Sequence, residues 1–258
     1  MLHAQLNGKC PELDNMEDIL TSTFFGYLEL VENPSWLKNV IYIFSERRKR
    51  KPSKNLFGSL ENLEIIGNLD EGTELEFEFW PKMYDGTEPD LLLVCKTEDL
   101  TIPIMFEIKY QSGLSHSDQL VLEYENLKNK RSQVLSNIDY ERGILVYLTK
   151  GKIRHTSAFN NSVEKIQDEG AFDESFTCIH LKWEEHMYRA LEKCSEEQYH
   201  TDIIGKMKKY LDNRDLAPFD GFDEDFETVY PDQYYQFSIS INWTEKEINP
   251  KMTWRFEK

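Results

Sequence analysis

Long apolar runs are missing from this sequence of 258 residues, and so is a secretory signal. No stretch approaches the ~20 apolar residues of a membrane-spanning helix, so we expect no contact with a membrane. The first residues do not show the charged and apolar regions of a signal sequence, which favours a cytoplasmic location. Neither an internal repeat nor a separate DNA-reading module, such as a helix-turn-helix or a zinc finger, is evident.

Cysteine and histidine are few and scattered. The four cysteines are Cys10, Cys95, Cys178 and Cys194. They show no Cys-x-x-Cys spacing and no clustered framework, which favours reduced thiols in a cytosol. The nearest pair among the six histidines is His180 and His186, so a zinc site is not expected.

Positive charge is also scarce, because 30 Lys and Arg face 47 Asp and Glu and leave a net charge of −17. Nucleic-acid binding usually depends on cations that neutralise phosphates. One segment departs from the trend. Its six basic residues are Arg47, Arg48, Lys49, Arg50, Lys51 and Lys54. We predict a DNA-contacting loop there, between a helix at 36–44 and the first core strand; a solvated or partner-binding loop is the alternative.

Apolar residues are plentiful: 40% of the chain is hydrophobic, with 15 Phe, 13 Tyr and 5 Trp. A chain of this size buries one large core, or one core with a smaller appendage. We predict a first domain at 1–215. Residues 216–258 are expected to form an acidic loop and a C-terminal β-hairpin packed on that domain.

Charged residues interrupt two apolar runs that are typical of buried strands, 90–95 and 104–109. Period-two alternation puts Glu107 and Lys109 on one face of the second strand. With Asp90 at the start of the first, they form the smallest set that can hold a divalent ion and activate water beside a phosphate. The alternative is a half-exposed ion pair between Glu107 and Lys109.

The residues Pro89-Asp90 and Glu107-Ile108-Lys109 resemble the motif of the PD-(D/E)XK nuclease superfamily. That family has a restriction-endonuclease-like core in the order αβββαβ, an α/β fold with a mixed sheet. This chain offers the same order over its first 150 or so residues. The predicted elements are a helix at 16–31, strands at 75–80, 90–95 and 104–110, a helix at 117–135 and a strand at 143–148. Helices and the hairpin would follow.

The resemblance implies a deoxyribonuclease that depends on Mg²⁺ or Mn²⁺. Asp90, Glu107 and the carbonyl of Ile108 would hold the ion. Lys109 would orient and deprotonate the attacking water, or stabilise charge on the phosphate. The first role needs a lowered pKa; an ion would lower it and the two carboxylates would raise it, and the sequence leaves both directions open.

Two helices offer further site residues. Gln119 resembles the glutamine of a Gln-Leu-x-x-Tyr element in this superfamily, although Tyr124 follows at five positions rather than four; a solvated Gln119 near a helix N-terminus is the alternative. A metal-associated Glu often lies on the first helix, and we choose Glu17. Glu12 and Glu29 are rivals, and Glu17 could instead only favour the helix N-terminus.

The predicted function is therefore hydrolysis of DNA phosphodiester bonds, by the effector subunit of a bacterial, antiviral defence or DNA-processing complex. The acidic composition suggests that a protein partner helps to deliver the DNA. The alternative is a catalytically silent interaction or regulatory protein that keeps the nuclease fold. The sequence does not indicate an oligomeric state.

Overall fold

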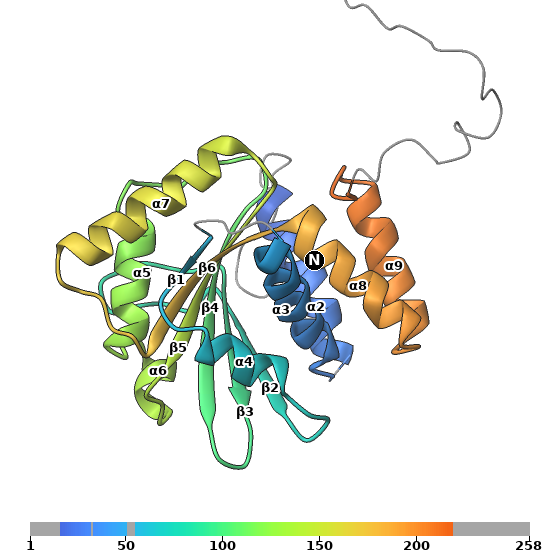
Figure 1. Ribbon diagram of the computed structural model, residues 1–258, viewed down its shortest axis with the longest axis horizontal. Coiled ribbons are helices and arrows are strands. Elements are labelled where there is room, and N and C mark those ends of the chain that lie inside the picture. Colours follow the sequence, from blue (N-terminus) through green and yellow to red (C-terminus); the bar gives the residue numbers. More distant parts are fainter. Residues whose placement is uncertain (1–15, 32, 51–54, 219–258) are drawn as a thin grey trace, which may run out of the picture. The chain divides into compact units, whose positions relative to one another are not determined.

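A six-stranded mixed sheet forms the centre of the computed structural model, which describes residues 16–31, 33–50 and 55–218 (Figure 1). Its strands are β1 (Leu56–Phe57), β2 (Glu74–Phe79), β3 (Leu91–Lys96), β4 (Thr101–Lys109), β5 (Gly143–Thr149) and β6 (Phe176–Lys182). Their order across the sheet is β1-β6-β5-β4-β3-β2. Neighbours β2, β3 and β4 are antiparallel, whereas β4, β5 and β6 are parallel.

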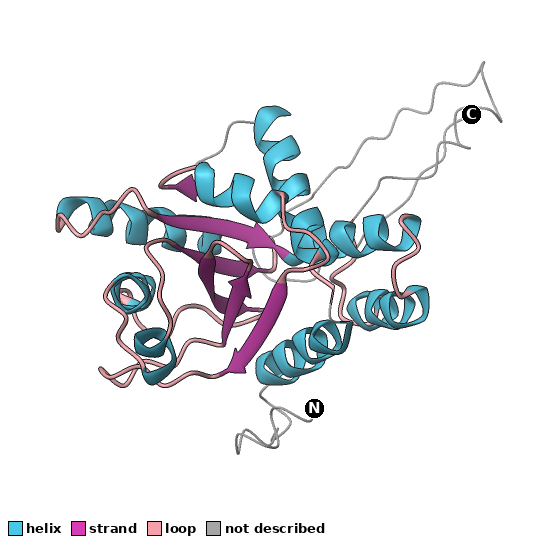
Figure 2. Cartoon of the chain, turned by 90° about the horizontal axis from the view of Figure 1, so that it is seen from below, coloured by secondary structure: helices cyan, strands magenta, loops and turns pink. Residues whose placement is uncertain are grey.

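Helices cover both faces of the sheet (Figures 1 and 2). The eight α-helices of the described ranges are α2 (Met16–Val31), α3 (Ser35–Arg50), α4 (Glu61–Gly67), α5 (Gln119–Lys128), α6 (Gln133–Asn137), α7 (Ile153–Asp168), α8 (Tyr188–Glu196) and α9 (Thr201–Asp212). Side chains of α2, α3, α4, α8 and α9 share one apolar cluster with the sheet, and those of α5, α6 and α7 share the other. The mixed α/β class predicted from the sequence is confirmed.

Strand β4 shows why the central strands are apolar throughout. Phe106 and Ile108 point into the first cluster, and Met105 points into the second, as the alternation of side chains requires. Because both faces are covered, every residue of β4 after Thr101 is buried. The charged residues Glu107 and Lys109 lie on the face of Met105, and this strand carries them into the interior.

Several predicted boundaries were wrong. The helix predicted at 117–135 is two helices, since α5 ends at Lys128 and the Ser132 hydroxyl, which accepts a hydrogen bond from the Leu135 amide at 3.1 Å, begins α6. The predicted basic loop is helical in its first part, because α3 continues to Arg50. Sequence inspection did not find β1, α4 or α7. A π-helical turn, Trp183–Met187, leads from β6 into α8. The C-terminal acidic loop and hairpin lie outside the described residues.

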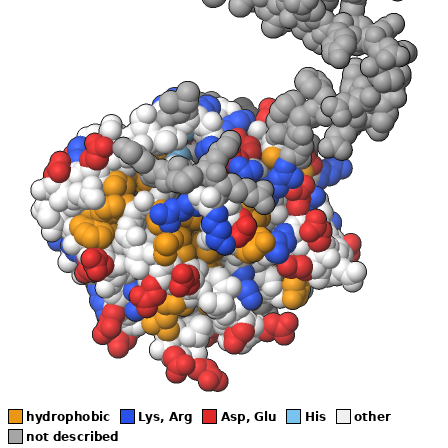
Figure 3. All heavy atoms as spheres, in the orientation of Figure 1, with side chains coloured by type: hydrophobic (Ala, Val, Ile, Leu, Met, Phe, Trp, Pro, Cys, Tyr) orange, Lys and Arg blue, Asp and Glu red, His pale blue; other side chains and the backbone are white. Residues whose placement is uncertain are grey.

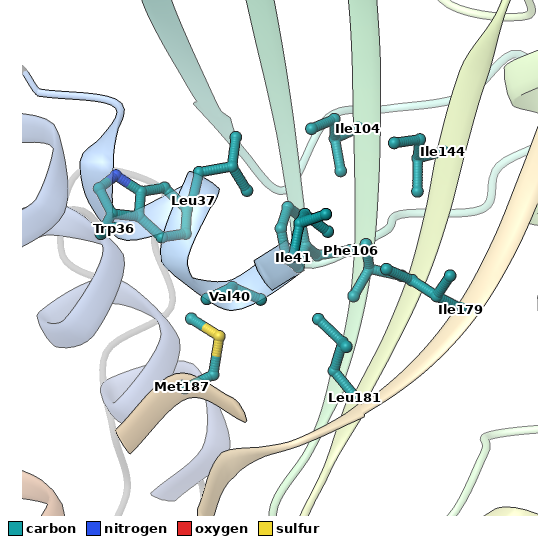
Figure 4. Close-up of a pocket in the computed structure, with 11 residues that line it drawn as sticks. Trp36, Leu37, Val40, Ile41, Ile104, Phe106, Ile144, Ile179, Leu181 and Met187 are labelled. Carbon is teal, nitrogen blue, oxygen red and sulfur yellow. The ribbon is translucent and has the colours of Figure 1, made fainter. Parts of the chain in front are cut away.

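A small apolar cavity lies between α3 and the sheet (Figure 4). Its lining consists only of apolar side chains, among them Trp36, Phe106 and Met187. Its free volume of about 10 Å³ is at the lower limit for one water molecule, so it is a packing gap rather than a ligand site. Separately, none of the helices in the described part is both long and apolar enough to span a membrane.

A buried histidine on β6 makes folding sensitive to pH. His180 is fully buried between the rings of Tyr147 and Phe159, and its Nε2 lies 2.8 Å from the hydroxyl of Thr149. Burial, with help from the charge of Lys182, lowers the pKa of His180 to about 3 from its ordinary 6.5. The unfolded chain therefore binds a proton between these two values that the folded chain does not, so this contribution to stability is complete above pH 6.5 and is lost as pH falls.

We expect the free energy of unfolding of the wild type to fall by about 2 kcal/mol more than that of His180→Asn between about pH 6.5 and pH 5, since one pKa unit corresponds to about 1.4 kcal/mol. Urea unfolding at several pH values measures this difference. Parallel pH profiles for the two proteins would contradict it.

Candidate active site and metal centre

The site begins where the β3–β4 ladder ends. The last paired residues are Leu91 and Phe106. One position before Leu91, the Asp90 amide donates to the Phe106 carbonyl at 3.1 Å, and the Asp90 carboxylate accepts the Ile108 amide at 2.7 Å. The side chain of Asp90 thus replaces a strand partner. Because the amide and carbonyl of a strand residue face the same neighbour, the Ile108 carbonyl also faces this end of β3.

Lys109 lies between two carboxylates. Its Nζ is 2.5 Å from Glu107 Oε1 and 3.0 Å from Glu17 Oε1. The first contact is an ion pair between two side chains of the same strand. Side-chain exposure is 1% for Glu107, 8% for Lys109 and 17% for Glu17. This is not the half-exposed pair considered as an alternative, because both partners on β4 are buried.

Glu17 belongs to the same cluster, although it comes from the first turn of α2. Its second oxygen accepts the Tyr110 amide at 2.8 Å and the Ser112 hydroxyl at 2.6 Å. Glu17 therefore holds both Lys109 and the loop that follows β4, which goes beyond stabilising the helix N-terminus. Its rival Glu29 lies twelve residues further along α2, about 18 Å away at 1.5 Å per residue. The other rival, Glu12, lies outside the described residues.

A fourth acid, Glu123 on α5, was missed by sequence reasoning. It is fully buried beside Glu107, and its Oε2 has no hydrogen-bond partner. Gln119, one turn earlier, donates to Glu123 at 3.1 Å and accepts the Ser115 amide at 2.9 Å. Gln119 is therefore tied to the site rather than merely solvated. The signal was the spacing of four between Gln119 and Glu123, which places both on one side of the helix.

The cluster holds more negative than positive charge. Burial, then the charge of Glu107, raises the pKa of Asp90 and of Glu123 well above the usual range. Burial also raises the pKa of Glu107, although Lys109 partly offsets this. Burial alone would lower the pKa of Lys109, but Glu107, Asp90 and Glu17 outweigh it and the pKa is raised. Without a bound ion, Lys109 is thus a firmly charged ammonium.

A divalent ion fits this excess of buried charge. The cluster holds four acidic side chains and one ammonium, and buried anions are costly unless they are paired or coordinate a metal. No three acidic, His or Cys side chains of the described residues converge as ready ligands. Mg²⁺, however, is commonly held by one or two carboxylates together with waters and a substrate phosphate. Asp90, Glu107 and the Ile108 carbonyl supply oxygen donors of that kind.

The predicted basic segment reaches the same edge of the sheet, but not the carboxylates. Arg47, in the last turn of α3, pairs with Glu185 at 2.8 Å, just beyond the end of β6. Lys49 pairs with Glu46 on its own helix at 2.7 Å. Because β4 and β6 run in the same direction, Arg47 lies at the edge of the sheet that carries Lys109, two strands away. Lys51 and Lys54 lie outside the described residues.

Comparisons of the chain with models of known protein families, with curated proteins and with solved structures find no match. The site therefore has to be interpreted from its own geometry.

Removing a carboxylate should stabilise the protein in the absence of metal. A raised pKa means that stability present at low pH is lost as pH rises, because the unfolded chain releases the proton of this carboxyl at a lower pH than the folded chain does. In chelator at about pH 8, we expect Glu123→Gln to raise the free energy of unfolding by about 1 kcal/mol, and the gain to vanish by about pH 4. The half-buried acid Glu125 on the same helix, whose side chain forms a 3.6 Å ion pair with Arg131, is the control, since Glu125→Gln should change stability by less than about 1 kcal/mol. Destabilisation by Glu123→Gln at pH 8 would refute the electrostatic account.

Metal should have the opposite effect. We expect Mn²⁺ or Mg²⁺ to raise the Tm of the wild type, by the equivalent of about 2.7 kcal/mol when the ion is at 100 times its Kd. Asp90→Asn should abolish the shift, because it removes one of two carboxylate ligands. Differential scanning calorimetry with and without EDTA measures both, and an equal shift in the two proteins would place the ion elsewhere.

Proposed function

We propose that this chain is a metal-dependent nuclease of the PD-(D/E)XK type that hydrolyses phosphodiester bonds in DNA. The observation that carries the proposal is the meeting of Asp90, Glu107 and Lys109 at the ends of two adjacent strands, in a buried cluster with excess negative charge. A structural ion pair alone does not account for this excess, because the cluster holds four acidic side chains and one ammonium.

The order of elements around the site supports the same proposal. Helix α2, strands β2, β3 and β4, helix α5 and strand β5 follow one another in the order αβββαβ, with α3, β1, α4 and α6 as additions. Asp90 directly precedes the second of the three antiparallel strands, and Lys109 ends the third. Helix α2 contributes Glu17 and helix α5 contributes Gln119, as the resemblance implies.

The proposed division of labour follows from the contacts. Asp90, Glu107 and the Ile108 carbonyl would hold Mg²⁺ or Mn²⁺. The ion would supply a Lewis acid that polarises a phosphate oxygen and a bound water. Asp90 is oriented for this by the Ile108 amide, and Glu123 lies buried beside Glu107.

Lys109 would act as a fixed positive charge. Its raised pKa favours the second of the two roles considered from the sequence, stabilisation of charge that builds up on the phosphate. Glu17 keeps the ammonium in place through its 3.0 Å contact and fixes the loop beside it. The ammonium also occupies space between Glu17 and Glu107, so we expect it to shift away from Glu107 when that carboxylate binds an ion.

Cleavage of DNA tests this function directly. With plasmid and single-stranded DNA in Mn²⁺ or Mg²⁺, we expect Asp90→Asn and Lys109→Ala to lower the cleavage rate by at least about 10²-fold, the size of effect seen when one charge-stabilising group is removed. Glu29→Gln, a change of an acid on the same helix as Glu17, should retain wild-type activity.

Equal cleavage by the wild type and both site variants would refute the assignment, since a contaminating nuclease would then be the source of the activity. Inactivity of the wild type on every nucleic acid, together with stoichiometric co-purification of a protein partner, would favour the alternative of a silent interaction protein. The role in a defence or DNA-processing complex depends on that partner and stays a prediction.

A further inference from the structure

Positive charge follows the candidate site along the edge of the sheet. Lys109 ends β4, Lys150 directly follows β5, and Lys182 ends β6. The register aligns Lys109 with Thr149, and Thr149 with Lys182. Neighbouring strands lie ~4.8 Å apart, so each of the three strand ends lies one strand spacing from the next, and Lys109 and Lys182 are two spacings apart. The opposite edge carries the exposed acids of two turns: Asp70, Glu71, Glu98 and Asp99. Figure 3 shows acidic side chains concentrated on the lower rim of the molecule, and basic ones nearer its middle and top.

The densest part of this edge is the beginning of α7, where Lys150, Lys152 and Arg154 form what we call the α7 basic cluster. Within the described residues none of the three forms an ion pair, although Lys150 lies 5.3 Å from the Tyr110 ring. Lys152 and Arg154 are exposed. The first turn of α7 carries no acid, so the partial positive charge of the helix N-terminus adds to that of the side chains.

Arg154 connects this cluster to the loop that follows β4. Its guanidinium donates to the carbonyls of Gln111 and Ser112, and the Ser112 hydroxyl donates to Glu17 at 2.6 Å. The cluster is therefore held in a fixed place beside Lys109. An anion that reaches Lys109 from the side of β5 has to pass it.

The charges of the cluster also affect the pKa of a neighbouring histidine, His155. His155 is buried on the first turn of α7, its Nδ1 lies 3.0 Å from the Tyr147 hydroxyl, and its Nε2 has no partner. Burial first, and then the charges of Arg154 and Lys152, lower the pKa of His155 to about 4.

Acids do not cancel the charge further along the edge. Glu185 pairs with both Lys182, at 3.0 Å, and Arg47, at 2.8 Å. One negative charge is therefore shared by two positive charges. Glu184 accepts the Gly151 amide at 3.3 Å and lies beside Lys150. The row of cations continues from the α7 basic cluster to the end of α3.

We propose that the α7 basic cluster binds the nucleic-acid phosphate next to the one that is cleaved, and that the strand continues from there over Lys182 toward Arg47. This inference rests on the proposed nuclease function and specifies the path of its substrate. It also accounts for how a chain with a net charge of −17 can hold DNA, because Lys109, the α7 basic cluster, Lys182 and Arg47 would meet the substrate together along one edge of the sheet.

Steady-state cleavage of a labelled single-stranded oligonucleotide in Mn²⁺ tests the proposal. We expect Lys150→Gln/Lys152→Gln to lower kcat/KM about tenfold at about 0.1 M salt, through KM, with kcat nearly unchanged. The plot of log kcat/KM against log salt should become shallower by about 0.7, since the loss of one phosphate contact removes ~0.7 from the slope for a single strand. The Mn²⁺-induced rise in Tm should match that of the wild type, which shows that the metal centre is intact.

The matched control removes the same charge from the opposite edge. Lys96→Gln/Lys130→Gln breaks two surface ion pairs, with Glu76 and Asp139, and should leave KM and the salt slope unchanged. A neutral methylphosphonate at the phosphate next to the cleaved bond gives a second measurement. It should weaken binding by the wild type but add nothing to the defect of Lys150→Gln/Lys152→Gln, because both changes remove one contact.

The outcomes separate the two proposals. If the wild type cleaves DNA and the α7 variant shows an unchanged KM and salt slope, or loses no more than the opposite-edge control, the substrate path is wrong while the nuclease function stands. If the wild type cleaves no nucleic acid, the function and the path fall together.

Discussion

The candidate site depends on the hydrogen bond from the Ile108 amide to the Asp90 carboxylate, at 2.7 Å. It takes the place of a ladder bond where β3 begins, so it fixes an anion at a point where the sheet would otherwise need a backbone partner. The same stretch of β4 brings Glu107 and Lys109 to the buried face. Two strand ends thus determine the positions of three charged groups, and α2 and α5 add one acid each.

This arrangement lowers the stability of the fold, because four acidic side chains and one ammonium are enclosed where apolar side chains would pack well. On the neighbouring strand β5, polar side chains face the buried charges. Tyr147 faces Glu107 across the β4–β5 register and bonds His155, and Thr149 faces Lys109 and bonds His180. Neutral, hydrogen-bonded side chains on β5 therefore lie beside the charged side chains of β4. Strain and charge that a fold retains against its own stability are typical of functional sites.

Much of this was predictable, for physical reasons. Strands β3, β4 and β5 follow from apolar runs, and the shared face of Glu107 and Lys109 follows from period-two alternation. The approach of Glu17 was anticipated only through family resemblance, since contacts between residues 92 positions apart leave no local signal. Glu123 was missed because its burial depends on how α5 packs. The end of α3 was misjudged because charged residues suggested a loop, although Lys and Arg are good helix formers. The α7 basic cluster needs the parallel register of β4 and β5, which sequence alone does not provide.

The most direct measurement is a crystal structure of the wild type soaked in Mn²⁺, with anomalous scattering to locate the ion. We expect one ion within ~2.0–2.6 Å of carboxylate oxygens of both Asp90 and Glu107, with the Ile108 carbonyl as a further ligand and Lys109 Nζ moved away from Glu107. An ion bound elsewhere, or an empty site with the 2.5 Å contact between Lys109 and Glu107 unchanged, would contradict the account.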